Sequence, residues 1–137
     1  MFSLSAKGVY GAAALVELAE HYRSGPIQIR DIASRNDIPQ HYLEQILSGL
    51  KRTGLVRSYR GAQGGYELTR HPDTIRLVEL LSELEGPLSV TPSGQSADNL
   101  AFLWGDLEQH IAAFLNRSLG DVMREKARRN QTVDFVI

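Results

Sequence analysis

The fold is decided by the stretch IPQHYLEQILSGLKRTGLVRSYRGAQGGYELT, residues 38–69. Its first half places a proline in the first turn of a helix, where the missing amide costs nothing, and Gly54 follows just after the expected helix end at Arg52. Its second half holds two β-prone runs, residues 55–60 and 66–69, around a glycine-rich tip. We therefore predict a helix followed at once by a two-stranded hairpin.

Two helices are predicted upstream of this stretch. Apolar residues recur every three or four positions from Ser5 to Tyr22, with Ser5 as N-cap, and a short helix follows from Gln28 to Arg35. Two short helices joined by a tight turn are typical of a helix-turn-helix, and the hairpin is then its wing. We predict a mainly α fold, a winged helix-turn-helix with a two-stranded β wing and a long C-terminal dimerisation helix.

The remainder of the chain is predicted to be helical around one loop. We expect a helix from Thr74 to Glu85, a long one capped by Asp98 or Asn99 and reaching Asn116, and a more polar one over residues 118–129, with a candidate linker in the tail beyond it. The predicted organisation is a DNA-binding region at 1–86, a short loop at 87–97, and the dimerisation helix, following helix and tail at 98–137.

Composition excludes several classes of protein. The 137 residues, 42% hydrophobic and 23% charged, suit one globular domain, and no apolar run approaches the roughly 20 residues of a membrane helix. We see no signal peptide. The absence of cysteine excludes disulfides, thiolate nucleophiles and cysteine-ligated metal sites, so we expect a cytoplasmic protein without a cofactor.

Charge is distributed unevenly along the chain, although the net charge is only −1. Residues 1–70 carry nine Lys or Arg against six Asp or Glu, whereas residues 71–137 carry six against ten. Within residues 51–70, five basic side chains face Glu67 alone. Polyanions are expected to be attracted to the end of the predicted helix and the hairpin.

The predicted recognition helix has one apolar and one polar face. Leu43, Ile46, Leu47 and Leu50 form a buried stripe, which leaves Gln40, His41, Tyr42, Glu44, Gln45, Ser48, Lys51 and Arg52 outward or at the rim. In the major groove a glutamine addresses adenine and a carboxylate accepts from cytosine N4, so Glu44 and Gln45 are the candidates for base readout. The alternative is a solvated helix face with no partner.

The wing and the first helix supply further candidate DNA contacts. Arg60 is placed to enter a minor groove, with Gly61 and Gln63 at the same tip and Arg57 on the first strand. A glycine-rich hairpin alone is often just a turn, and only the preceding helix-turn-helix makes this one informative. Ser5 and Lys7 are candidates for a phosphate contact at a helix N-terminus, although a simple cap explains Ser5 equally well.

The 98–116 helix carries a large apolar stripe at heptad-like intervals: Leu100, Leu103, Trp104, Leu107, Ile111, Phe114 and Leu115. The stripe is larger than a small head of three helices is expected to cover, which favours a dimer seam over ordinary core. No nucleophile, base and orienting group occur together, and the four histidines lack metal-ligand spacing. We expect neither an enzyme nor a metal protein; the alternative to a regulator is a winged helix that mediates protein contacts.

The motifs at residues 41–45, 54–56, 60–61 and 64–66 closely resemble the signature of the Rrf-type bacterial regulators, the IscR/NsrR/CymR family. Residues 5–10 and 119–122 are similar too. The resemblance implies a symmetric dimer on palindromic operators, with His41, Tyr42, Glu44 and Gln45 at contact positions and Arg60 in a minor groove.

The chain departs from that family's sensor branch, whose loop holds an iron-sulfur cluster through three cysteines, because residues 87–98 offer none. It resembles instead the cluster-free branch typified by the cysteine-metabolism repressor CymR, which acts with cysteine synthase. By that resemblance the terminal carboxylate of Ile137 is a candidate for capture by cysteine synthase. The alternative is that the tail packs as a short strand or over the partner subunit.

Overall fold

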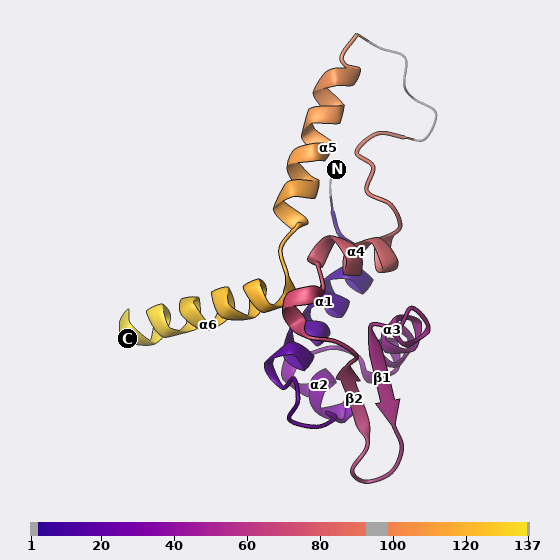
Figure 1. Ribbon diagram of the computed structural model, residues 1–137, viewed down its shortest axis with the longest axis vertical. Coiled ribbons are helices and arrows are strands. Elements are labelled where there is room, and N and C mark those ends of the chain that lie inside the picture. Colours follow the sequence, from indigo (N-terminus) through magenta and orange to yellow (C-terminus); the bar gives the residue numbers. More distant parts are fainter. Residues whose placement is uncertain (1–2, 93–98, 137) are drawn as a thin grey trace.

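The computed structural model describes residues 3–92 and 99–136, arranged as a head from which two helices depart (Figure 1). The head contains α1 (Ala6–Glu20), α2 (Ile29–Asn36), α3 (Gln40–Arg52), the wing and α4 (Leu77–Glu85). From the head α5 (Ala101–Leu115) rises and α6 (Leu119–Val136) projects sideways. The predicted fold class, a mainly α winged helix-turn-helix, is confirmed.

The core of the head is built around α1, which packs against α2, α3, α4 and α6. Leu15 on α1 and Leu43 and Leu47 on α3 are completely buried, and burial of each such side chain contributes about 1.5–3 kcal/mol. Between α2 and α3, Asp37 takes the left-handed conformation (φ 54°, ψ 48°), which aspartate tolerates better than most residues. The four leucine and isoleucine positions predicted as the inner face of α3 are all buried.

One charged side chain lies inside the head and joins two helices. Glu17 on α1 is 6% exposed, and its carboxylate accepts hydrogen bonds from Arg35 Nη1 at 2.7 Å and Asn36 Nδ2 at 2.8 Å. A buried carboxylate is tolerated when it is paired and hydrogen-bonded in this way. The contact fixes the end of α2 on α1 and so helps to orient the helix-turn-helix.

The wing consists of the antiparallel strands β1 (Val56–Tyr59) and β2 (Gly65–Leu68), with Val56 opposite Leu68 in the core. Ile27, two residues before the start of α2, adds an isolated bridge to Tyr66 through two backbone hydrogen bonds of 2.8 and 2.9 Å. Gly65 permits this approach: its φ is +139°, and a Cβ there would lie 2.3 Å from the Ile27 carbonyl oxygen. The wing is therefore anchored to the start of α2.

α4 begins later than the sequence predicts. A short 3-10 turn (Pro72–Thr74) precedes it, and Ile75 is extended rather than helical. The amide of Leu77 donates to the Arg117 carbonyl at 2.8 Å, and the amide of Leu119 donates to the Ile75 carbonyl at 2.9 Å. Long-range backbone pairing has replaced the first helical turn expected from Thr74.

The last two helices also differ from the prediction at their ends. α5 starts at Ala101 with Leu100 in the N-cap position, so Asn99 lies in a turn ahead of the helix, and Asp98 is outside the described residues. Ser118 and Asp121 cap the start of α6 reciprocally, backbone to side chain, at 3.0 and 2.9 Å. α6 then stays helical to Val136, so the linker expected after Arg129 and the alternative of a strand were wrong.

Candidate nucleic-acid interface

The outer face of α3 presents polar side chains to solvent. Gln40, His41, Glu44, Gln45, Ser48, Lys51 and Arg52 are all exposed, as the helical spacing predicts. Tyr42 differs, because it is half-buried and its ring meets that of Tyr10 edge-on, with centroids 5.8 Å apart. Tyr42 therefore also packs α3 against α1.

One face of the wing carries a hydrogen-bonded cluster. Arg57 Nε donates to Glu67 Oε1 at 2.8 Å, and the Tyr59 hydroxyl donates to the same oxygen at 2.9 Å. The hydrogen bond from Arg57 lowers the pKa of Glu67 and raises that of Arg57. Arg57, a predicted DNA contact, is thus already paired. Tyr59 was missed by the sequence analysis, although strand alternation puts it on the same face as Arg57.

The tip of the wing is exposed and is attached to the start of α2. Arg60, Gly61 and Gln63 all face solvent, and the tip turn is closed by the Gly64 amide donating to the Gly61 carbonyl at 2.9 Å. Outside the wing, Gln28 Nε2 donates to the Ala62 carbonyl at 2.9 Å. Together with the Ile27 bridge, this bond ties the tip to the start of α2.

A cleft separates the wing from the starts of α2 and α3. It has a volume of about 420 Å³ and is lined by Gln28, Ile29, Arg30, Gln40, Ser58, Tyr59, Arg60, Gly61, Gly64, Gly65 and Tyr66. It brings together the predicted site residues Gln40, Arg60 and Gly61. It also contains Gln28 and Arg30, which the sequence analysis missed. Both lie at the start of the first helix of the helix-turn-helix, and that position in the sequence could have indicated them.

The N-terminus of α1 is engaged by a carboxylate from α4. Ser5 caps α1 by accepting from the Gly8 amide at 3.4 Å, while the backbone amide and hydroxyl of Ser5 both donate to Glu85 Oε1, at 3.1 and 2.5 Å. Gly8 makes room, because a Cβ there would lie 2.3 Å from Glu85 Oε1. The cap predicted for Ser5 is therefore present. Lys7 is exposed, and the phosphate contact of both residues stays a prediction.

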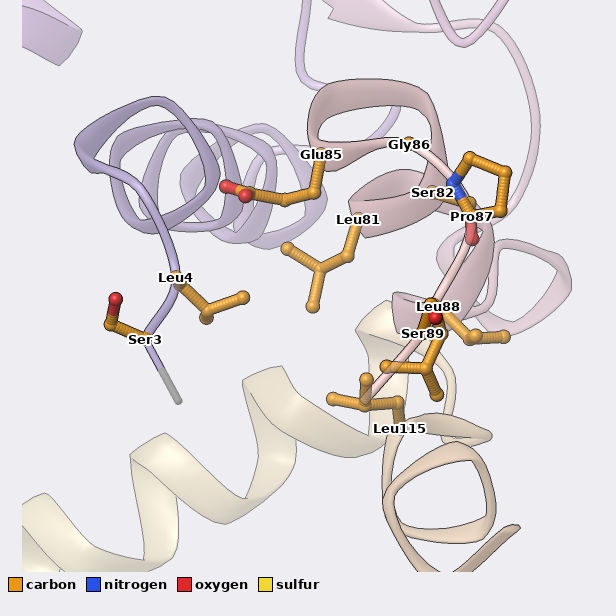
Figure 2. A pocket seen from close by; sticks show the side chains of 11 residues that line it. Ser3, Leu4, Leu81, Ser82, Glu85, Gly86, Pro87, Leu88, Ser89 and Leu115 are labelled. Atoms are coloured by element: carbon orange, nitrogen blue, oxygen red, sulfur yellow. The ribbon is translucent and has the colours of Figure 1, made fainter. Parts of the chain in front are cut away.

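Beside this contact lies a mostly apolar hollow of about 200 Å³ (Figure 2). The side chains of Leu4 and Leu81 point into it, Leu88 comes from the segment after α4, and Leu115 comes from the end of α5. The Glu85 side chain extends across one side of the hollow toward α1. The start of α1, the end of α4 and the end of α5 thus meet at one place.

α5 carries its apolar side chains in the open. None of its fifteen residues is buried; among those predicted for the seam, Leu100, Leu103, Trp104 and Phe114 are exposed, and Leu107, Ile111 and Leu115 are intermediate. Phe102, which the sequence analysis left out, is 66% exposed, the highest value among the large apolar side chains whose burial the structure describes. Arg117 covers the Phe114 ring at 4.0 Å from its centroid.

Within residues 3–92 and 99–136, no group of three or more His, Cys, Asp or Glu is placed to hold a metal ion. With no cysteine anywhere in the sequence, the donor set does not fit an iron-sulfur cluster. In the same described residues, no helix combines the length and apolarity needed to cross a membrane.

With α3 exposed beside an anchored wing, the fold is that of a winged-helix regulator, and comparison with known proteins agrees. The family described as "Rrf2: Iron-dependent Transcriptional regulator" matches residues 4–125. The HTH-type transcriptional regulator CymR of Bacillus subtilis is 45% identical over 86 residues, 63% of this chain but only 62% of the relative.

Solved structures extend the likeness to most of the chain. The structure of CymR, the global cysteine regulator of B. subtilis, matches with a TM-score of 0.83 at 36% identity, over 91% of this chain and 98% of that one. T. potens IscR matches with a TM-score of 0.79 at 34% identity, over 91% and 88%. The chain belongs to the Rrf2 family of transcriptional regulators and is not an enzyme.

Proposed function

We propose that the protein is a homodimeric, sequence-specific regulator that represses transcription by occupying a palindromic operator in the cytoplasm. The observation that carries the proposal is the exposed polar face of α3 beside a wing anchored to α2. Two α3 helices would enter successive major grooves, and each wing would reach a flanking minor groove.

The proposed contacts fall into groups according to the part of the DNA that each residue would contact. Glu44 and Gln45 are assigned to base edges, with His41, Tyr42 and Ser48 beside them, and Arg60 with Gly61 and Gln63 to the minor groove. Lys51, Arg52 and Arg57 are assigned to phosphates, with Ser5 and Lys7 at the start of α1 and Gln40 at the start of α3. The exposed carboxylate of Glu44 supports base readout. Phosphates repel a carboxylate, and a hydrogen bond accepted from a base would offset that repulsion.

Dimerisation through α5 is supported by exposure. An isolated chain would leave Leu103, Trp104 and Phe114 exposed to water on one side of the helix, and exposed apolar patches of this kind mark protein interfaces. The alternative that the stripe is ordinary core is disfavoured, because no residue of α5 is buried by the rest of the described chain.

Genomic-fragment selection tests the function directly. The purified protein is incubated with sheared genomic DNA at about 150 mM salt, where nonspecific electrostatic binding is weak, and bound fragments are sequenced. We expect one palindromic motif, relaxed at major-groove positions by Glu44→Ala and at flanking A·T positions by Arg60→Ala. Gln131→Ala on α6 serves as control and should select the wild-type motif. Recovery of random fragments would favour the protein-contact module instead.

The regulated process that we propose is cysteine and sulfur metabolism, because the similar structure is that of a global cysteine regulator. We further propose that the segment ending at Ile137 docks into a cysteine synthase. Since α6 is helical to Val136, an extended docked segment would require its last turn to unwind. Isothermal titration of a peptide with the sequence of residues 128–137 into cysteine synthase tests this; a peptide ending in alanine is the control, and no heat from the natural sequence would contradict it.

A further inference from the structure

The cleft between the wing and the starts of α2 and α3 has the chemistry of an anion site. Arg30 and Arg60 contribute guanidinium groups, Gln40 contributes an amide, and Ser58 contributes a hydroxyl. The side-chain amide of Gln28, also in the lining, already donates to the Ala62 carbonyl. Among the residues that line it, all of them in the described part of the chain, none has a carboxylate. Arginine and amide donors without an acid favour a phosphate over a cation or an apolar ligand.

Arg30 is available for such a ligand. Its side chain is 72% exposed, and its nearest acid, Asp31, lies 4.0 Å from Nε, at the limit of an ion pair. Arg30 lines both the cleft and a neighbouring hollow, whereas Asp31 lines only the neighbouring hollow. Between two exposed groups at that distance the attraction is weak, so a phosphate would compete with little opposition.

The cleft is also fixed in shape before any ligand arrives. The Gln28 amide holds the wing at the Ala62 carbonyl, and Ile27 pairs with Tyr66 on β2. The wall formed by the wing and the wall formed by α2 are therefore joined at two points. A rigid, preformed site loses little entropy when it binds.

The position of the cleft identifies the phosphate. If α3 enters a major groove and the tip of the wing enters the adjacent minor groove, the sugar-phosphate strand that divides the two grooves must run between them. The cleft lies at that place, with Gln40 of α3 on one side and Arg60 of the wing on the other. We infer that the cleft binds a phosphate of this dividing strand, with Arg30 as its principal cation; this rests on the proposed function.

A phosphate contact has a signature distinct from a base contact. Each phosphate neutralised contributes about 0.9 to the slope of log K against log salt for duplex DNA. We expect Arg30→Ala to lower that slope by about 0.9 per protomer, or about 1.8 for a dimer on its operator. It should weaken binding to the operator and to unrelated DNA by the same factor, because a phosphate carries no sequence information.

The experiment measures fluorescence anisotropy of labelled operator and labelled random duplex at salt concentrations from about 50 to about 300 mM, where the affinity for DNA falls steeply with salt. Arg30→Lys keeps the charge and should retain the slope, while Arg129→Ala on α6 removes an equally exposed arginine and should change nothing. An unchanged slope for Arg30→Ala, or a relaxed base preference, would overturn the inference. If the wild-type protein did not bind the operator, the proposed function itself would be contradicted.

Discussion

The head buries its large apolar side chains, whereas α5 leaves most of its own exposed. In the head, leucines and isoleucines from every helix meet in one core, and the polar side chains of α3 remain outside. In α5, a helix of the same length as α1, no residue is fully buried, and its phenylalanines and tryptophan are exposed. The difference indicates two kinds of partner: the polar face of the head suits a polyanion, and the apolar face of α5 suits a second copy of itself.

The largest effect that we expect from this comparison is loss of a core side chain. Leu15→Ala removes a completely buried side chain from the centre of the head and should lower the free energy of unfolding by about 2–5 kcal/mol. Urea denaturation followed by circular dichroism measures it. The loss should be the same at every protein concentration, because the core lies within one chain; a loss that vanishes on dilution would contradict this.

A smaller effect, of a different kind, is expected at α5. Leu103→Glu with Phe114→Glu places charges on the exposed stripe, and hot-spot side chains contribute about 2 kcal/mol or more, so the dimer dissociation constant should rise at least about 30-fold. Sedimentation velocity measures association, and circular dichroism checks that the helices remain. Gln109→Glu is the control and adds one negative charge, against two in the double variant, at an exposed polar position of α5. Equal sedimentation of the double variant and the wild type would refute the seam.

Within the head, the anchoring of the wing is expected to matter modestly. Gln28→Ala removes the hydrogen bond to the Ala62 carbonyl, which is worth about 1 kcal/mol, so preference for A·T flanks should fall about fivefold at most. Binding to operators with A·T or G·C flanks measures it. Preference at the central positions read by α3 should not change, and a change there would mean that the wing and α3 are not independent readers.

The smallest effect is expected at the Arg57–Glu67 pair. Glu67→Gln releases Arg57 and removes a negative charge from the wing, so binding to all DNA should tighten slightly. The pKa of Glu67 is lowered in the folded protein, so its carboxylate is ionised at every pH above the ordinary pKa of a glutamate. The stability that its pairing with Arg57 contributes is therefore present above that ordinary pKa and is lost only as pH falls through the lower pKa of the folded state. The difference between variant and wild type should therefore be constant from about pH 6 to 8; anisotropy titrations at several pH values check this.

Local patterns in the sequence predicted most of the fold. The apolar stripe of α3, the cap at Ser5 and the glycine-rich wing each depend on residues close in sequence, and each is found in the structure. The start of α4 was wrong because Ile75 pairs with Leu119, more than forty positions away, and no local pattern reveals that pairing.

The candidate site was predictable to the same extent. Helical spacing placed the outward residues of α3 correctly, and turn chemistry placed Arg60 at an exposed tip. The place of Arg30 and Gln28 at the start of the first helix of the helix-turn-helix was a local signal that the analysis did not use, but the cleft that they line forms only when the wing folds back on the start of α2. The contact of Glu85 with Ser5 likewise joins positions far apart in sequence, and only tertiary structure brings them together.

The central claim is that α3 and the wing face DNA while α5 pairs two chains. Hydroxyl-radical footprinting of the selected operator by the wild-type protein tests both parts in one measurement. The account predicts two equivalent protected regions, related by the palindrome and with centres about 10 base pairs or a multiple of that apart. A single asymmetric footprint, or protection without any symmetry, would contradict it.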